Sequence, residues 1–234
     1  MIEVHSGRVS RADPTKWMIR LSDYGRAPCL DVFERWAASW ERANFRMLSR
    51  SVDRLRYAAA HGGLRLALCK ATGRPLASIC IAESSTGKPF TVGGPSFSLS
   101  YASSEAWAVI GPQAALGLDV VALDRASERL DRSFASLADL VAVRRHVPDA
   151  ARPDLIAWAA KEAAAKLTDD VARSPERWRV RYERGLRVEA DGHPPIEIAL
   201  VDLGDHHVAA ISQAASARFR TNLCFSGLRR LWER

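Results

Sequence analysis

The stretch LGLDVV, residues 116–121, decides how the chain is interpreted, because it sets one acidic side chain inside a run of apolar ones. A short apolar run of this kind predicts a buried β-strand. Asp119 near its centre needs a partner, since an unpaired charge inside a protein is too costly to keep ionised. That partner is either an arginine of the same chain or a bound divalent metal ion.

A second informative stretch is WAAKEAAAKL, residues 158–167, which predicts the central part of a helix. Glu162 and Lys166 are four positions apart, so they share one helical face, and Trp158 precedes Glu162 by the same step. A Glu–Lys pair at this spacing among alanines also stabilises a helix by itself. The pattern alone therefore leaves a structural and a catalytic interpretation open.

Hydrophobic periodicity predicts helices followed by strands in each half of the chain. Helices are expected over residues 30–48, 51–68 with Ser51 as the N-cap, 127–146 and 153–166; strands are expected over 17–21, 77–82, 97–101, 106–110, 115–121, 177–182, 196–201 and 206–212. This grouping argues against a doubly wound parallel sheet, in which helices and strands alternate strictly. We expect an α+β fold of two similar halves, residues 1–112 and 113–234.

Composition narrows the class of protein. The chain has 234 residues, of which 47% are hydrophobic and 26% charged, enough to bury a core and too apolar for a disordered chain. Its formal net charge of +7 favours anionic partners. No apolar run is long enough for a membrane span and residues 1–17 lack a signal-peptide core, so we expect a cytoplasmic protein. Four widely spaced cysteines without a CxxC pair indicate buried thiols rather than disulfides or a zinc site.

A third stretch with chemical potential is GKPFTVGGPSFSLSYA, residues 87–102. Lys88 lies in a predicted tight turn and Ser100 near the end of a predicted strand, where an ammonium, a hydroxyl and backbone N–H groups could hold a phosphate. An ordinary β-hairpin would explain the same residues. The stretch becomes informative only in combination with the other two.

Together these stretches resemble the phosphopantetheinyl transferase superfamily, especially its Sfp-type enzymes. The family shows, in order, a GKP turn, an FNxSHS strand, a GxDxE strand and a W-x-x-KE-x-x-x-K helix, which correspond here to residues 87–89, 97–102, 117–121 and 158–166. Residues 53–68 resemble the family's arginine-bearing helix, and residues 206–212 its late strand. The chain departs from the family pattern at Tyr101, where histidine is expected, at Val121, where a second acid is expected, and at residues 168–170, where a glycine-rich turn is expected.

The resemblance implies transfer of 4′-phosphopantetheine from coenzyme A to a serine hydroxyl of an apo carrier protein, dependent on Mg²⁺. It implies two pseudo-symmetric halves, each a small antiparallel sheet packed with helices, with coenzyme A in the cleft between them. Asp119 and Glu162 would hold Mg²⁺, Glu162 would take the serine proton, and Lys166 would neutralise the transferring phosphate. Since Val121 provides no carboxylate, we expect a raised magnesium requirement.

The resemblance also suggests which residues contact the two substrates. The candidates for binding coenzyme A are Lys88, Ser100, Tyr101, Arg56, Arg46 and Lys161. The carrier protein is expected to be acidic and helical, attracted by the basic chain. Leu123, Leu130, Phe134 and Leu137 could offer it an apolar patch, although they could equally be core residues. With both halves in one chain, we expect a monomer.

Two other functions remain open at this point. A non-catalytic member of the fold would keep coenzyme A or carrier binding without the chemistry, consistent with Val121 and Tyr101. A nucleic-acid-binding protein is suggested by the net charge and by seven tryptophans, but the sequence contains no RNP, KH or zinc-finger pattern, so we expect no specific nucleic acid partner.

Overall fold

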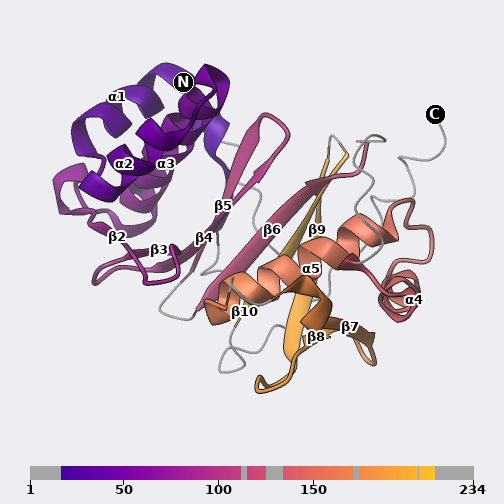
Figure 1. Ribbon diagram of the computed structural model, residues 1–234. Coiled ribbons are helices and arrows are strands. Elements are labelled where there is room, and N and C mark those ends of the chain that lie inside the picture. The colour runs from indigo at the N-terminus through magenta and orange to yellow at the C-terminus, as the bar shows by residue number, and fades with distance from the viewer. Residues whose placement is uncertain (1–16, 112–114, 125–133, 171–173, 205, 214–234) are drawn as a thin grey trace. The chain divides into compact units, whose positions relative to one another are not determined.

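The computed structural model describes residues 17–111, 115–124, 134–170, 174–204 and 206–213 (Figure 1). They belong to two compact units, unit 1 with residues 17–111 and unit 2 with the later ones. Every strand pairing is antiparallel and the described residues form five α-helices, which confirms the predicted α+β class. Within these ranges, no helix combines the length and hydropathy that crossing a bilayer requires.

Unit 1 consists of three helices and two small sheets. The helices are α1 (Arg26–Trp36), α2 (Ser39–Met47) and α3 (Ser51–Thr72), and the strands are β1 (Trp17–Arg20), β2 (Ile81–Glu83), β3 (Pro89–Thr91), β4 (Ser96–Ala102) and β5 (Glu105–Gly111). One sheet has the order β1-β5-β4, and β2 and β3 form a separate hairpin. Leu64 and Leu68 of α3 pack with Ala108 and Ile110 of β5 in the core of this unit.

The helix predicted over residues 30–48 is wrong, because the chain forms two helices there. Ala37 and Ala38 are extended, and Glu41, in the first turn of α2, accepts the N–H of Ala38 at 2.7 Å. The other bonds of the Glu41 carboxylate go to His61 and Arg65 of α3. The apolar periodicity is continuous through this region, but the break brings a buried carboxylate to its partners.

Helix α3 also begins one residue earlier than predicted, with Arg50 at the N-cap in place of Ser51.

Close contact between α1 and α3 depends on Gly62. A Cβ atom at this position would lie 1.8 Å from the carbonyl oxygen of Cys29, so any side chain would overlap the backbone of α1. Cys29 itself is buried, as the sequence predicted for the thiols, whereas Cys80 is exposed.

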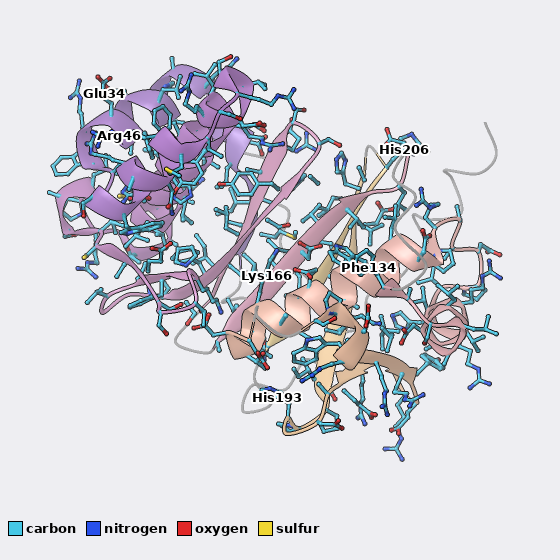
Figure 2. The ribbon with its side chains drawn as sticks, viewed as in Figure 1. Glu34, Arg46, Phe134, Lys166, His193 and His206 are labelled. Carbon is cyan, nitrogen blue, oxygen red and sulfur yellow. The ribbon has the colours of Figure 1, made fainter. Side chains whose placement is uncertain are left out.

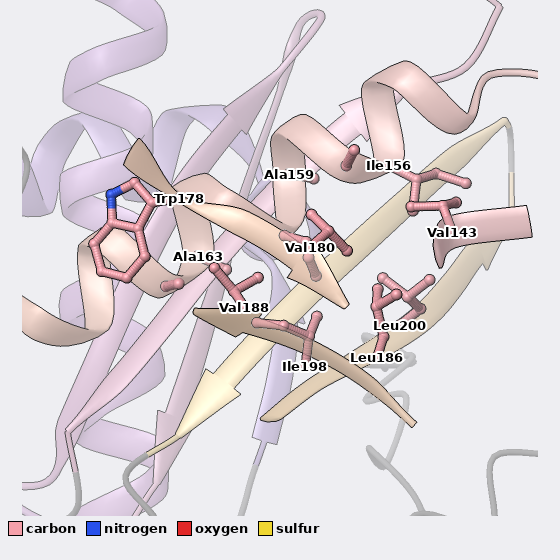
Figure 3. Close-up of a cluster of buried hydrophobic side chains, with 14 of the residues drawn as sticks. Val143, Ile156, Ala159, Ala163, Trp178, Val180, Leu186, Val188, Ile198 and Leu200 are labelled. Carbon is pink, nitrogen blue, oxygen red and sulfur yellow. The ribbon is translucent and has the colours of Figure 1, made fainter. Parts of the chain in front are cut away.

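Unit 2 is a five-stranded sheet with the order β6-β10-β9-β8-β7 and two helices. The strands are β6 (Leu116–Ala122), β7 (Arg179–Tyr182), β8 (Leu186–Glu189), β9 (Ile196–Gly204) and β10 (His207–Gln213), and the helices are α4 (Leu137–His146) and α5 (Pro153–Thr168). Figure 3 shows α5 side chains packed against this sheet, with Val180, Val188 and Ile198 in the centre of the core. Strand β8 was not predicted, since a four-residue alternation is too short to stand out.

The helix predicted over residues 127–146 is shorter in the part that the structure describes. Ser136 is the N-cap of α4, where its hydroxyl accepts the N–H of Asp139 at 3.2 Å and its own N–H donates to the Asp139 carboxylate at 2.8 Å. This reciprocal pair fixes the start of α4 at Leu137. Residues 127–133 lie outside the described residues.

Candidate functional site

Asp119, Glu162 and Lys166 come together in unit 2. Asp119 lies in the middle of β6, opposite Ala210 of β10, on the face of the sheet covered by α5. The Nζ atom of Lys166 donates to Asp119 Oδ1 at 2.7 Å and to the carbonyl oxygen of Leu118 at 3.0 Å, and Figure 2 shows where Lys166 leaves α5. Lys166 is therefore one partner of Asp119, and the sequence did not predict this bond.

Glu162 lies one turn before Lys166 on α5 and is half-buried. Burial raises its pKa above the usual value, the negative charge of Asp119 raises it further, and Lys166 opposes both effects. Glu162 and Lys166 share one face of α5, and Lys166 bonds Asp119, so the same ammonium lies beside Asp119 and one helical turn from Glu162. Lys166 thus lies within electrostatic reach of both carboxylates.

The backbones of β6 and α5 touch next to this site, which fixes the position of the three side chains. A Cβ atom on Gly117 would lie 1.9 Å from the carbonyl oxygen of Ala163 and 2.8 Å from the backbone nitrogen of Leu167. The hydroxyl of Ser212 on β10 donates to the same Ala163 carbonyl at 2.7 Å. With glycine on the strand and alanine on the helix, Lys166 can reach both Asp119 and the strand backbone.

The donor set suits one magnesium ion with incomplete protein ligation. Asp119 and Glu162 offer hard carboxylate oxygens, and Mg²⁺ commonly completes its shell with waters and substrate oxygens. Val121 shares the Asp119 face of β6 but belongs to the hydrophobic core, so it adds no ligand. The described residues contain no group of three or more histidine, cysteine, aspartate or glutamate side chains arranged to hold a metal.

Lys161 is placed away from these three residues. Its side chain is only 2% exposed, and its ammonium donates to Asp139 Oδ2 at 2.8 Å and to the carbonyl oxygen of Phe134 at 2.9 Å. Burial would raise the pKa of Asp139, but hydrogen bonds from Lys161, Val180 and Ser136 lower it below the usual value. This buried pair connects α4 to α5, and the placement gives no support to the predicted contact between Lys161 and coenzyme A.

Two of the predicted coenzyme A contacts meet in unit 1. The Arg56 guanidinium carbon lies 5.6 Å from the centre of the Tyr101 ring, and its Nη1 donates to the carbonyl oxygen of Ser103 at 2.7 Å. The Tyr101 hydroxyl is buried without a hydrogen-bond partner among the described residues, and burial is the largest cause of its raised pKa. Ser100, the preceding residue of β4, is also buried. An arginine and the ring of a tyrosine thus lie close together in this unit.

The other two predicted contacts in unit 1 lie on different elements. Lys88 follows Gly87, whose φ of 87° forms the turn between β2 and β3, and its backbone N–H donates to the hydroxyl of Ser84 at 3.1 Å. Arg46 is exposed in the last turn of α2 (Figure 2). The predicted GKP turn is therefore a hairpin turn, and no described contact joins Arg46 to the other candidates.

The proposed apolar patch for a carrier protein divides into core and surface residues. Leu123 packs against the core of unit 2, and the ring of Phe134 meets that of Trp158 edge to face with centroids 4.8 Å apart. Leu137 is 78% exposed, and Leu130 lies outside the described residues. Leu123 and Phe134 are thus half-buried, and Leu137 is a surface residue.

The acids that replace the expected glycine-rich turn end α5. Asp169 takes the left-handed conformation that often closes a helix, with a φ of 58°, and its N–H donates to the carbonyl oxygen of Ala165. The carboxylate of Asp170 lies 3.4 Å from Nε2 of His193. Asp169 thus performs the local backbone role for which glycine is usually required.

Sequence reasoning missed a buried ionic network in unit 1. Glu41, His61 and Arg65 are all buried, with Glu41 Oε1 2.7 Å from both His61 Nδ1 and Arg65 Nη1, and a second Arg65 contact to Glu41 Oε2. Burial would raise the pKa of Glu41, but the hydrogen bonds from His61 and Arg65 lower it to about 2. His61 and Arg65 are four residues apart in a stretch of α3 that is otherwise apolar. This spacing could have indicated that both face one buried acidic partner.

Neither the protein-family models nor the curated proteins contain a match to this chain. The function therefore has to be argued from the geometry of the site and from the motif resemblance.

Proposed function

We propose that the protein transfers 4′-phosphopantetheine from coenzyme A to a serine of an acidic apo carrier protein, as a monomer with two pseudo-symmetric halves. The supporting observation is the meeting of Asp119, Glu162 and Lys166, which lie in two segments joined by a 2.7 Å ion pair across 47 positions of sequence. The motif resemblance names the same three residues.

In the proposed reaction, the serine oxygen forms a bond to the phosphorus that carries pantetheine, and the bond from that phosphorus to adenosine 3′,5′-bisphosphate breaks. Glu162 takes the serine proton, and its raised pKa brings this carboxylate closer to the range in which a base works near neutral pH. Lys166 stabilises the charge that develops on the transferring phosphate. Asp119 and Glu162 would hold Mg²⁺, which neutralises the pyrophosphate when bound.

The polar groups of unit 1 are proposed to bind coenzyme A. Arg56 offers a guanidinium, which would exchange its bonds to Ser103 and Asp53 for two parallel hydrogen bonds to phosphate, and the Tyr101 hydroxyl would add a third. Ser100, Lys88 and Arg46 are the remaining candidates. Tyr101 brings no positive charge, so we expect weaker binding of the coenzyme A 3′-phosphate than a protonated histidine would give.

The test is transfer to an apo carrier protein. Purified protein is incubated with coenzyme A, Mg²⁺ and an apo acyl or peptidyl carrier domain, and the carrier is weighed by mass spectrometry. We expect the carrier to gain one phosphopantetheine group with the wild type, and the rate to fall by about a hundredfold or more in Glu162→Gln and Lys166→Ala. Glu176→Gln, an exposed glutamate of the same unit, is the matched control. Activity that survives both site variants would refute the assignment.

A second candidate is a non-catalytic protein of the same fold that binds coenzyme A. Two observations favour it: Val121 lies in the core in place of an acid, and Tyr101, whose hydroxyl is buried, replaces a histidine. Calorimetric binding of coenzyme A, without any mass gain on a panel of carrier domains, would support this candidate over the transferase.

A further inference from the structure

Lys161 and Asp139 form a buried ion pair that the proposed reaction does not use. The side chains are 2% and 3% exposed, and the Lys161 ammonium lies 2.8 Å from Asp139 Oδ2. Taking two opposite charges out of water is costly, and apolar residues of similar volume often stabilise a protein equally well. The pair therefore needs an explanation other than stability.

The Asp139 carboxylate is bonded to three elements of unit 2. Its Oδ1 accepts the N–H of Val180 in β7 at 2.7 Å, and its Oδ2 accepts the N–H of Ser136, the N-cap of α4, at 2.8 Å. The third element is α5, through Lys161, whose ammonium also donates to the carbonyl oxygen of Phe134 at 2.9 Å. Lys161 is thus bonded to a group that is itself held by the sheet and by the start of α4.

The apolar packing of α5 around Glu162 does little to fix the rotation of the helix. Between Trp158 and Lys166 the buried apolar residues are all alanines: Ala159, Ala160, Ala163, Ala164 and Ala165. Packed helices are held in register by ridges of side chains that enter grooves on the neighbouring surface, and alanine forms only a low ridge. Lys161 is the one long side chain that is buried in residues 158–166, so its bonds supply what the alanines do not.

The polar bonds hold α5 from two sides. Because each residue turns a helix by about 100°, Lys161 leaves α5 about 100° from Glu162 and about 140° from Lys166. Lys166 bonds Asp119 of β6 at 2.7 Å, whereas Lys161 bonds Asp139 of α4. A helix bonded on one side can roll about that contact, and a bond on a second side prevents the roll. The direction in which Glu162 points therefore depends on both lysines.

We propose that Asp139 and Lys161 are positioning residues, which set the rotation of α5 and so the place of the Glu162 carboxylate relative to Asp119. This inference rests on the proposed function and gives the buried lysine of the helix motif a role that needs no contact with coenzyme A. A misplacement of about 1 Å in a catalytic group can lower a rate by up to about a hundredfold. Loss of the pair should therefore reduce kcat and metal affinity and leave substrate binding unchanged.

The experiment compares Lys161→Met and Asp139→Asn, alone and combined, with the wild type. The control is Arg187→Met, which removes one positive charge from an ion pair with Glu183 in the same unit. Steady-state transfer to an apo acyl carrier protein separates kcat from KM, and electron paramagnetic resonance measures the affinity for Mn²⁺.

We expect kcat to fall about tenfold in each single variant, and no further in the double variant, because both changes remove the same pair. The KM values for coenzyme A and the carrier should stay within about twofold of the wild type. The Kd for Mn²⁺ should rise about threefold or more, since Glu162 would supply one of the two protein ligands. The control should stay within about twofold in every measurement.

The outcomes separate this inference from the proposed function. If Lys161→Met is folded by circular dichroism and keeps the wild-type kcat and Mn²⁺ affinity, the positioning role is wrong and the proposed function stands. If Lys161→Met does not fold, Asp139→Asn decides by the same criteria, because its amide oxygen can still accept the Val180 N–H. A raised KM for coenzyme A with unchanged kcat would make Lys161 a substrate contact and overturn the inference. If the wild type does not modify the carrier, both are wrong.

Discussion

Replacing Gly117 by alanine tests how the site is built. The new Cβ atom would lie 1.9 Å from the Ala163 carbonyl oxygen, 2.4 Å from the Ser212 hydroxyl and 2.8 Å from the Leu167 nitrogen. Ordinary contact requires about 3.5 Å, so α5 would have to move away from β6 by about 1.5 Å. Overpacking of this kind costs about 1–3 kcal/mol, and the closeness of two backbone atoms places Gly117→Ala at the upper end.

The same movement would lengthen the ion pair between Lys166 and Asp119. We therefore expect Gly117→Ala to lower the urea midpoint of unfolding and also to reduce kcat/KM for phosphopantetheine transfer. Gly185→Ala is the matched control, because nothing lies within 4 Å of its Cβ position. If Gly117→Ala unfolds at the same urea concentration as the wild type, our account of how α5 is positioned is wrong.

Three further predictions concern charge. In Lys166→Met, removal of the ammonium that donates to Asp119 should tighten Mn²⁺ binding, measured by electron paramagnetic resonance, even though transfer is lost. In Val121→Glu, a carboxylate added to the Asp119 face should lower the Mg²⁺ concentration that gives half-maximal transfer. Glu41→Ala should lower the free energy of unfolding by about 3–5 kcal/mol, because it leaves Arg65 buried and unpaired. Since the folded pKa of Glu41 is about 2 against an ordinary 4.5, wild-type stability should decline as the pH falls from about 4.5 towards 2, and less so in Glu41→Ala.

A specific result would contradict each of these three predictions. Mn²⁺ affinity that is unchanged in Lys166→Met would mean that the lysine does not compete for Asp119. An unaltered Mg²⁺ dependence in a folded Val121→Glu protein would mean that position 121 does not face the metal. For Glu41, acid unfolding curves of the variant and the wild type that run in parallel would exclude the network as a source of acid sensitivity.

The sequence predicted the strand and the helix that carry Asp119, Glu162 and Lys166, but not the bond between Lys166 and Asp119. The strand over residues 115–121 and the helix over 153–166 are found close to their predicted positions, as Leu116–Ala122 and Pro153–Thr168. Periodicity identifies such elements because each buries a continuous apolar face. It carries no information on which helix covers which strand, so Lys166 was predicted to act on phosphate but not to bond Asp119.

The failures have a common physical origin in pairing between distant residues. One helix was predicted over residues 30–48, where the apolar spacing is regular, but the bonds from Glu41 to α3 require a break at Ala37 and Ala38. Leu137 and Phe134 looked alike as apolar helix positions, yet one is exposed and the other packs on Trp158. Local patterns cannot distinguish such cases, because the deciding contact lies elsewhere in the chain.

The alanines of α5 limit how this protein can be engineered. Ala157, Ala159, Ala160, Ala163 and Ala164 are completely buried, so the helix approaches its neighbours through the smallest chiral side chains. A larger residue at any of them would displace Glu162 and Lys166 although it touches no substrate. Libraries intended to broaden substrate range should therefore leave these five codons fixed and diversify exposed positions, where added volume does not change the register of the helix.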